Sequence, residues 1–240
     1  MNFLKNLLLV FVFLPTAAMS ATMYTDQASY LAALSAGGYT IINEGFEDDL
    51  TWSASRSTIS NPATTPFVIS HGIKWTSNYG TNEVSTGGLG GSVIDGSHGF
   101  YSIPHGNQET TQTLACANAE EPNIPDSCWQ EDGWIGTSVD AGKLYGVGGW
   151  IDGTFGAKVT ILLDGVNFEE DPANRDGTRV ADWTFVGIIE PAGFTTFEIR
   201  ELSGKGGQNE LIFGDAFAIG ASSVPVPLPM PSAVWFLLLD

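Results

Sequence analysis

The stretch KVTILLDGVNF, residues 158–168, decides the fold class. Its first six residues alternate, so the large apolar side chains fall on one face of an extended strand. The Asp-Gly dipeptide that follows favours a two-residue turn between antiparallel strands. We therefore predict a β-hairpin with one buried face, which is formed by Val159, Ile161 and Leu163.

The same pattern extends along most of the chain. Phe197 and Ile199 alternate with charged residues in the same way, and glycine-rich stretches separate the apolar segments. No internal repeat is present, which argues against a solenoid or a propeller. Further strands are predicted at 39–43, 72–77, 99–103, 144–151, 183–189 and 210–219.

One segment near the N-terminus has helical periodicity. Residues 26–36 follow Thr25, which can cap a helix, and they precede a Gly-Gly pair that can end one. The predicted apolar stripe consists of Ala28, Leu31 and Leu34. About ten short strands with a single short helix predict an all-β protein, a β-sandwich of the jelly-roll type over residues 21–222.

The first twenty residues differ from this body. A lysine, Lys5, precedes the apolar run LLLVFVFLP, and small residues follow it. This order is typical of a secretory signal peptide, and the apolar run is too short for a stable membrane anchor. We expect residues 1–20 to direct export by the general secretory route, with cleavage after Ser20 or Ala21.

The last segment, residues 223–240, is rich in proline and ends in a short apolar run. Alternating prolines exclude a helix interior and a central strand, so we predict an extended tether. The apolar run at 233–239 is far shorter than the roughly 20 residues that span a bilayer. We therefore expect the chain to contact the membrane only transiently, through its two ends.

The tail resembles the sorting signal of PEP-CTERM exported proteins, in the variant that begins VPLPA. Val226, Pro227, Leu228 and Pro229 match the proline motif, and residues 234–237 match the start of the apolar helix. The sequence reaches Asp240 without the basic segment of such signals, so the match is to a truncated or degenerate signal. The resemblance implies sorting by an exosortase and a location at the cell surface or in the extracellular matrix of a Gram-negative bacterium.

Three phrases in the body resemble phrases of exported proteins of this class. They are INEGFE at 42–47, GIKWTS at 72–77 and FGDAF at 213–217, and they occur in the same order. The resemblance implies a jelly roll of the galactose-binding type. It also implies extracellular polysaccharide as a partner.

The charge balance restricts the partners further. The chain has 27 acidic and 9 basic residues, a net charge of −18, and 43% hydrophobic residues. Such a polyanion repels nucleic acid and anionic lipid, so we exclude nucleic-acid binding. Carboxylate oxygens suit calcium, although an acidic composition also serves solubility alone.

Glu47 and Asp215 are the candidate metal ligands. The first and last strands of a jelly roll can pair, which would bring these two carboxylates together. The resemblance to sugar-binding jelly rolls implies a structural calcium ion there. The alternative is a solvated loop with Asp215 at a turn.

The two cysteines, Cys116 and Cys128, lie in a loop-like stretch of an exported chain. An even number of cysteines in that compartment indicates a disulfide. A zinc site is disfavoured, because the loop has no CxxC pair and no histidine.

The sequence predicts no catalytic residues. His71, His98 and His105 form no HExxH frame and no i, i+4 pair, and the chain contains no GxSxG motif. We interpret the histidines as residues of turns or strand ends. With 27 acidic residues, some carboxylate pair will always have suitable spacing, so such a pair is weak evidence for glycoside hydrolysis.

Tryptophans supply the candidate ligand site. Trp52, Trp129 and Trp134 lie in or beside predicted loops, where a half-exposed ring can stack on a sugar, and Tyr79 and Tyr101 are further candidates. Tryptophans in predicted strands are assigned to the core: Trp75, Trp150 and Trp183. We therefore predict a non-catalytic surface protein that binds extracellular polysaccharide. The alternatives are a secreted glycan hydrolase or lyase on the same sandwich, and a purely structural surface protein.

Overall fold

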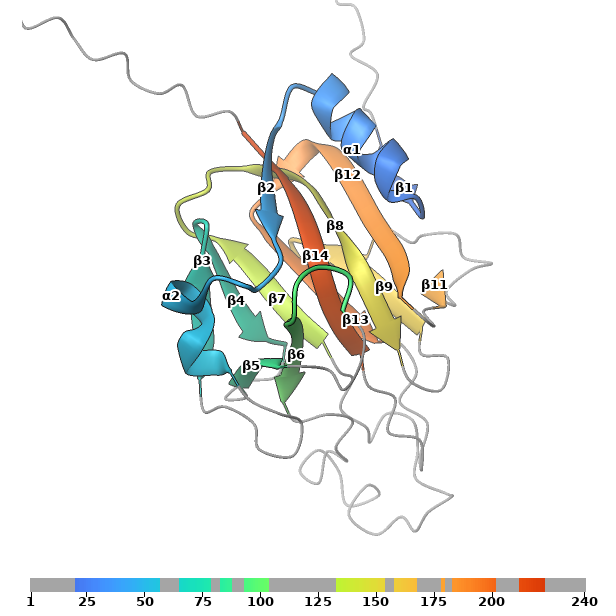
Figure 1. Cartoon of the computed structure of the whole chain (residues 1–240). Helices are drawn as coiled ribbons and strands as arrows, with labels where there is room; N and C mark the ends of the chain where they lie inside the picture. The colour runs from blue at the N-terminus through green and yellow to red at the C-terminus, as the bar shows by residue number, and fades with distance from the viewer. Residues whose placement is uncertain are drawn as a thin grey trace, which may run out of the picture.

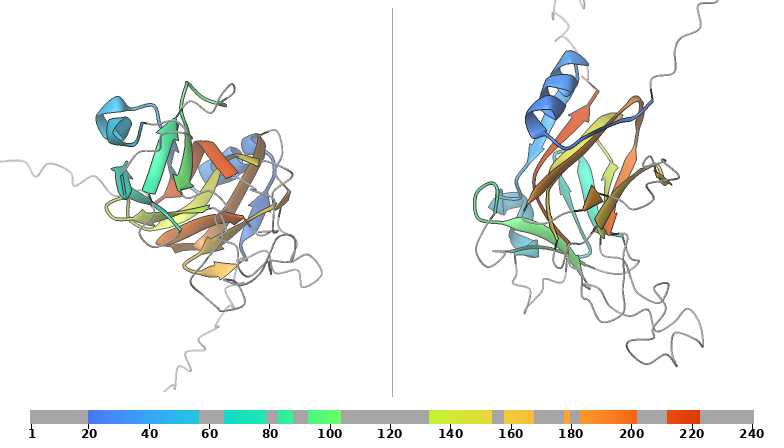
Figure 2. Two further views of the ribbon diagram at one scale, coloured as in Figure 1. Left: turned by 90° about the horizontal axis from the view of Figure 1, so that it is seen from below. Right: turned by 90° about the vertical axis from the view of Figure 1, so that its right-hand side faces the viewer.

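The computed structural model describes residues 20–56, 65–78, 83–87, 93–103, 133–153, 158–167, 178–179, 183–201 and 212–222. Over these residues the chain forms two antiparallel β-sheets packed face to face, with helix α1 on the outside of one sheet (Figures 1 and 2). No helix of the described part is long and apolar enough to cross a bilayer. The predicted β-sandwich and its short N-terminal helix are confirmed, and the structure adds two further short helical segments.

Sheet 1 has the strand order β1–β12–β8–β14–β6–β5, and β2 also pairs with β14. Its strands are β1 (Thr22–Tyr24), β2 (Thr40–Glu44), β5 (Glu83–Gly87), β6 (Gly99–Ile103), β8 (Leu144–Gly153), β12 (Thr184–Phe194) and β14 (Ile212–Ala221). Strand β14 is therefore central, with β8 on one edge and with β2 and β6 sharing the other.

Sheet 2 has the order β10–β9–β13–β7–β4–β3, and β11 also pairs with β9. Its strands are β3 (Phe67–Ser70), β4 (Ile73–Ser77), β7 (Gly133–Ser138), β9 (Lys158–Leu163), β10 (Val166–Asn167), β11 (Thr178–Arg179) and β13 (Thr196–Glu201). The helices are α1 (Gln27–Ala36), α2 (Asp49–Trp52) and the 3-10 helix η1 (Ser53–Ser55).

The strand pairing is nested along the chain. Strand β6 pairs with β14, β7 with β13, and β8 with β12, while β9 pairs with β10 and β11. From β6 to β9 successive strands alternate between the two sheets, and β12, β13 and β14 alternate again. This is the topology of a jelly roll, in which one long antiparallel hairpin is wound into two sheets.

The hairpin at 158–167 forms as predicted. Leu163 lies opposite Val166, and the two residues between them, Asp164 and Gly165, have φ of 48° and 79°. Two left-handed residues in succession match the right-handed twist of the flanking strands. The predicted inward face, Val159, Ile161 and Leu163, belongs to the core.

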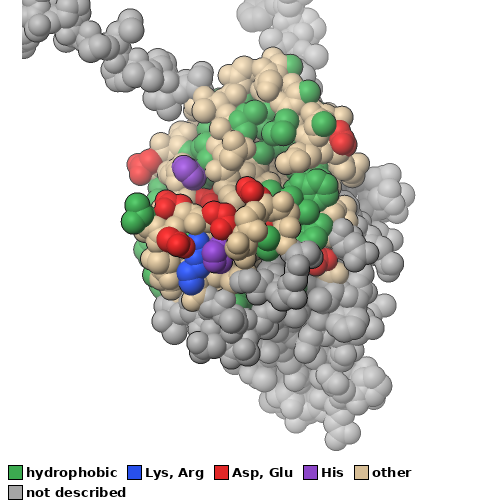
Figure 3. Space-filling model, in the orientation of Figure 1, with side chains coloured by type: hydrophobic (Ala, Val, Ile, Leu, Met, Phe, Trp, Pro, Cys, Tyr) green, Lys and Arg blue, Asp and Glu red, His purple; other side chains and the backbone are tan. Residues whose placement is uncertain are grey.

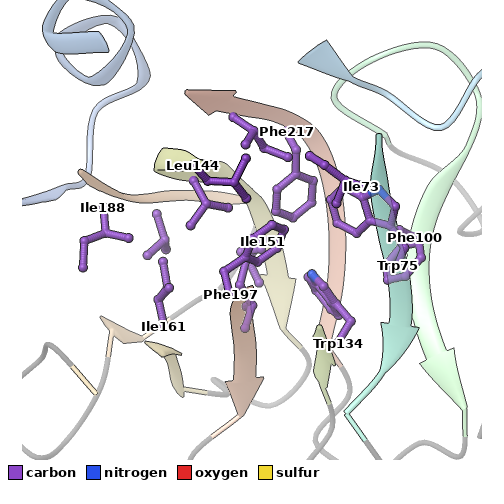
Figure 4. Close-up of a cluster of buried hydrophobic side chains, with 14 of the residues drawn as sticks. Ile73, Trp75, Phe100, Trp134, Leu144, Ile151, Ile161, Ile188, Phe197 and Phe217 are labelled. Atoms are coloured by element: carbon purple, nitrogen blue, oxygen red, sulfur yellow. The ribbon is translucent and has the colours of Figure 1, made fainter. Parts of the chain in front are cut away.

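Aromatic rings from both sheets meet in the core. Trp75 and Trp134 of sheet 2 contact Phe217 and Phe100 of sheet 1, with ring centroids 5.5 Å apart for Trp75–Phe217 and 5.4 Å for Phe100–Trp134 (Figure 4). Most of these contacts are edge-to-face, the geometry that the ring quadrupole favours. Buried aromatic rings therefore join the two sheets, together with the aliphatic side chains of the same core.

Helix α1 begins one residue later than predicted. Asp26, not Thr25, is its N-cap, and the Asp26 carboxylate accepts a hydrogen bond from the Ser29 N–H at 2.8 Å. The buried face also differs from the predicted stripe, because Tyr30 and Leu34 are buried whereas Ala28 is exposed. The large tyrosine ring, and not the smaller alanine, faces sheet 1.

Glycines in sheet 1 allow the helix to lie close to the strands. A Cβ added at Gly148 would lie 2.9 Å from both the Tyr30 and the Phe185 rings, and one at Gly146 would lie 2.7 Å from Leu34. The Tyr30 hydroxyl also donates a hydrogen bond to the Ala218 carbonyl at 2.9 Å. The GVGG motif at 146–149 is therefore a docking surface for α1.

Candidate functional site

The first long strand and the last strand pair, as the sequence predicted. In the register of β2 and β14, Glu44 lies opposite Phe217. The chain reverses just after β2 at Phe46, which has a left-handed φ of 60°, and the Glu44 carboxylate accepts a hydrogen bond from the Phe46 N–H at 2.7 Å. This reversal directs Glu47 toward the segment 94–98.

Two carboxylates hold that segment, which leads into β6. Asp215 accepts hydrogen bonds from the N–H groups of Ile94 and Asp95 at 2.7 and 2.9 Å. Glu47 accepts hydrogen bonds from the N–H groups of Ser97 and His98 at 2.7 and 2.6 Å. We call residues 94–98 the clamped turn.

A β-bulge in β14 positions Asp215 for this role. Between Asp215 and Ala218, β14 has one residue more than β8 opposite, and Ala216 has a left-handed φ of 48°. A bulge of this kind changes which face successive side chains occupy. Asp215 therefore faces outward toward the clamped turn, while Phe217 belongs to the core.

The environment of each carboxyl group sets its pKa. Burial raises the pKa of Asp215 and of Glu44 above their usual values, although hydrogen bonds to each carboxylate act in the opposite direction. Glu47 is only partly buried, and its hydrogen bonds with His98 and Ser97 outweigh that burial and lower its pKa. Glu47 is therefore the more readily ionised of the two residues that hold the turn.

Charged groups gather at this end of the sandwich. In Figure 3, acidic side chains, two histidines and basic side chains lie together on one side of the face shown. Arg56 joins the parts of this end: it forms an ion pair with Asp49 at 2.9 Å and donates to the Phe46 carbonyl at 2.6 Å. It thereby fixes α2 against the reversal after β2.

These contacts bear on the predicted calcium site. Each of the four carboxylate oxygens of Glu47 and Asp215 already has a polar partner: backbone N–H groups and the His98 ring. Among the described residues, no group of three or more metal-binding side chains is present. This arrangement does not fit a calcium ion at Glu47 and Asp215, and calcium binding stays a prediction from the sequence.

The described histidines lie at turns, as interpreted from the sequence. His71 is the first of the two turn residues between β3 and β4 and has a left-handed φ of 49°. His98 precedes β6, and its Nδ1 lies 2.8 Å from Glu47 Oε2. His105 lies outside the described residues.

The predicted sugar platforms Trp52 and Trp134 require correction. Both side chains are 0% exposed, so neither ring can present a face to a ligand. Trp52 packs edge-to-face on Phe46 at 5.0 Å, and Trp134 packs on Phe100 in the core. Tyr101 is also completely buried, whereas Trp129 and Tyr79 lie outside the described residues.

The exposure of Trp150 differs from the prediction. It was assigned to the core, yet it lies on the outer face of sheet 1 and is partly exposed. The Phe185 ring packs edge-to-face against it, with centroids 5.8 Å apart. Only Trp75 of the three tryptophans assigned to the core is completely buried, since Trp183 is also partly exposed.

Further aromatic residues share this outer face. On β14, Phe213 precedes the inward Gly214, and its ring contacts Tyr101 of β6 at 5.9 Å. We call these outer aromatic residues of sheet 1, together with Asp152 and Asp215, the aromatic face. Its accessible members are Trp150 and Asp152, which are partly exposed, and its buried members are Tyr101, Phe185, Phe213 and Asp215.

The register places the two aspartates beside the aromatic rings. Asp215 is the direct cross-strand partner of Trp150, and Asp152 is the partner of Phe213. Of these residues only Trp150 and Asp152 are partly exposed, and an exposed ring beside an oxygen acceptor suits a polar organic ligand. One sequence signal could have indicated this face. The residues of β8 that point outward before Trp150 are glycines, Gly146 and Gly148, so Trp150 follows them on the same face.

Several predicted sites lie outside the described residues. These are Cys116 and Cys128, the sorting motif Val226–Pro227–Leu228–Pro229, and the signal peptide up to residue 19. The disulfide and the two targeting segments therefore stay predictions.

No protein-family model matches the chain, and no curated protein matches it in sequence. Among solved structures, it is similar to the CBM22-1 xylan-binding domain of Xyn10C from Paenibacillus barcinonensis. The TM-score is 0.40 and the sequence identity 11%, over 78% of this chain and 97% of that one. At this level of similarity the likeness assigns no function.

Proposed function

We propose that this chain is a non-catalytic exported protein that binds extracellular polysaccharide through the aromatic face of sheet 1. The observation that carries the proposal is the position of Trp150: partly exposed, packed on Phe185 and directly opposite Asp215. A ring fixed by its neighbours loses little freedom when a sugar stacks on it.

Four of the described carboxylates support a non-catalytic role. Glu44, Glu47, Asp164 and Asp215 each accept hydrogen bonds from backbone N–H groups. A general acid or base needs access to the substrate, whereas these groups hold turns in place.

Export and location rest on the two ends of the chain. The N-terminal pattern supports secretion, and the resemblance of the tail supports sorting by an exosortase to the surface or matrix of a Gram-negative bacterium. Polysaccharide is abundant in that compartment and would be available as a ligand.

Affinity electrophoresis of the secreted chain through gels that contain soluble polysaccharides tests the proposal. We expect retardation by at least one polysaccharide, and a loss of about tenfold in affinity for Trp150→Ala, which corresponds to about 1.4 kcal/mol. Phe67→Ala is the matched control, because Phe67 is 44% exposed on the other sheet. Equal affinity of Trp150→Ala and wild type, with both folded, would refute this site.

A further inference from the structure

We infer that the ligand of the aromatic face is a neutral polysaccharide, and that polymers of uronic acids or sulfated sugars are excluded. This inference rests on the proposed function, because it concerns the chemical class of the ligand at the same site. It is carried by the distribution of charge over the two sheets.

Sheet 1 contains carboxylates and no basic residue. Its seven strands have no lysine, arginine or histidine, although together they form the larger part of the jelly roll around β14. The acidic residues of these strands are Glu44, Glu83, Asp152, Glu190 and Asp215. The strands of this sheet therefore offer no cation to a ligand on its outer face.

Acidic residues also lie on and beside the aromatic face itself. Asp152 is partly exposed two residues after Trp150 on β8, and Asp95 is exposed in the clamped turn, whereas Asp215 opposite Trp150 is buried. Two unit charges about 4 Å apart near a protein surface interact with about 4 kcal/mol. Screening reduces this severalfold, so repulsion of an anionic sugar by Asp152 is of the same order as the gain from one stacked ring, about 1 kcal/mol, and offsets it.

The described basic side chains lie elsewhere. Lys74 of β4 lies over the Phe67 ring of sheet 2 at 4.6 Å, Arg200 of β13 pairs with Glu198 of the same strand at 3.5 Å, and Arg56 is bound to Asp49. Lys143 precedes β8 at the end opposite Asp152. None of them is placed to neutralise a carboxylate or sulfate group of a sugar at Trp150.

A neutral sugar fits the same groups. Its C–H face can stack on the Trp150 ring, and its hydroxyl groups can donate hydrogen bonds to Asp152. A carboxylate acceptor forms stronger hydrogen bonds than a neutral one, so the negative charge that repels an anionic polymer helps to bind a neutral polymer.

A panel of two polymer types tests the inference. Neutral glucans and xylan form one arm, and polygalacturonate and alginate form the other, each with the secreted chain in chelator and at low and high salt. We expect binding to a neutral polymer that changes less than twofold with salt, and no binding to either polyanion. Tighter binding to a polyanion would overturn the inference and leave the proposed function standing. Binding to neither arm would overturn both.

A charge reversal gives a second readout. In Asp152→Lys, we expect weaker binding to the neutral polymer and new, salt-sensitive binding to polygalacturonate. Asp140→Lys is the matched control, since it makes the same change of charge at an exposed position in the loop before β8. If both variants gain the same affinity for polygalacturonate, net charge and not the aromatic face excludes anions, and the inference is wrong.

Discussion

Glu47 and Asp215 hold the two halves of one turn. Glu47 accepts hydrogen bonds from the N–H groups of Ser97 and His98, and Asp215 accepts them from the N–H groups of Ile94 and Asp95. The two acids come from the segment after β2 and from the last strand, so the turn joins distant parts of the chain. Asp215 is also the cross-strand partner of Trp150. The clamped turn is therefore fixed relative to the candidate binding site.

Removing the Glu47 carboxylate should release one half of the turn. For Glu47→Ala we expect a loss of about 1 kcal/mol in the free energy of unfolding, because hydrogen bonds to a charged group are worth about 1.5 to 3 kcal/mol and partial exposure reduces this. Urea denaturation at neutral pH measures it. Asp140→Ala, at an exposed position, serves as the control and should leave the midpoint unchanged. An unchanged midpoint for Glu47→Ala as well would show that the clamp does not stabilise the fold.

Glu44 should make stability depend on pH in an unusual direction. Burial raises its pKa in the folded state, so its ionisation opposes folding at neutral pH, and that cost disappears as the pH falls through the raised value. We expect Glu44→Gln to be more stable than wild type at pH 8. The difference should shrink toward pH 4, where the wild-type carboxyl group is protonated. Thermal melting across this range measures it, and a difference that grows toward low pH contradicts the assignment.

The glycine surface under α1 gives a packing prediction. Gly148→Ala would place a Cβ 2.9 Å from two buried rings, those of Tyr30 and Phe185. Overpacking of this kind costs about 1 to 3 kcal/mol. The melting temperature should fall by several degrees, whereas Ala28→Ser on the exposed side of α1 should leave it nearly unchanged. Wild-type stability of Gly148→Ala would mean that the helix docks less closely.

The calcium prediction can be tested directly. Because all four oxygens of Glu47 and Asp215 already have polar partners, we expect a chelator to leave the melting temperature unchanged. An ion bound only by the folded state would raise the melting temperature with its concentration. A calcium-dependent rise that Asp215→Asn abolishes would therefore restore the predicted site.

The residue before β1 favours one of the two predicted cleavage positions. Ala21 is partly buried against the core and Ser20 is exposed, so folding makes use of the chain from Ala21 onward. Cleavage after Ser20 also leaves small residues at both required positions, Ala18 and Ser20, whereas cleavage after Ala21 would place Met19 at one of them. We expect the exported chain to begin at Ala21, which intact-mass measurement can show. A chain that begins at Thr22, or that keeps residues 1–20, would contradict this.

Local patterns were sufficient for most of the architecture. The Asp164–Gly165 dipeptide specified a hairpin through backbone sterics alone, and the alternation in β9 and β13 specified which side chains face inward. Strands β1, β3, β5, β7 and β11 were not predicted. They are short or rich in small polar residues and glycine, so their extended conformation depends on neighbouring strands more than on their own residues.

The candidate site was harder to predict, because it depends on which face of a strand is covered. Trp52 follows a strand and lies in a four-residue helix, where it turns inward, while Trp150 lies mid-strand with its ring outward. The left-handed residue of the bulge in β14 is Ala216, a residue type that does not indicate a bulge. The sequence gives the spacing of side chains along a strand, whereas the position of α1 over one half of sheet 1 decides which of them stay accessible.

The central position of β14 has a mechanical consequence. The chain continues from β14 into the proline-rich tail, and β14 is hydrogen-bonded along both edges, to β8 on one side and to β2 and β6 on the other. A pull on the tail along the strand would have to shear these ladders at the same time, whereas an edge strand could be peeled away one bond at a time. If the protein is held through this tail, a pulling force therefore acts on the strand that has neighbours on both sides.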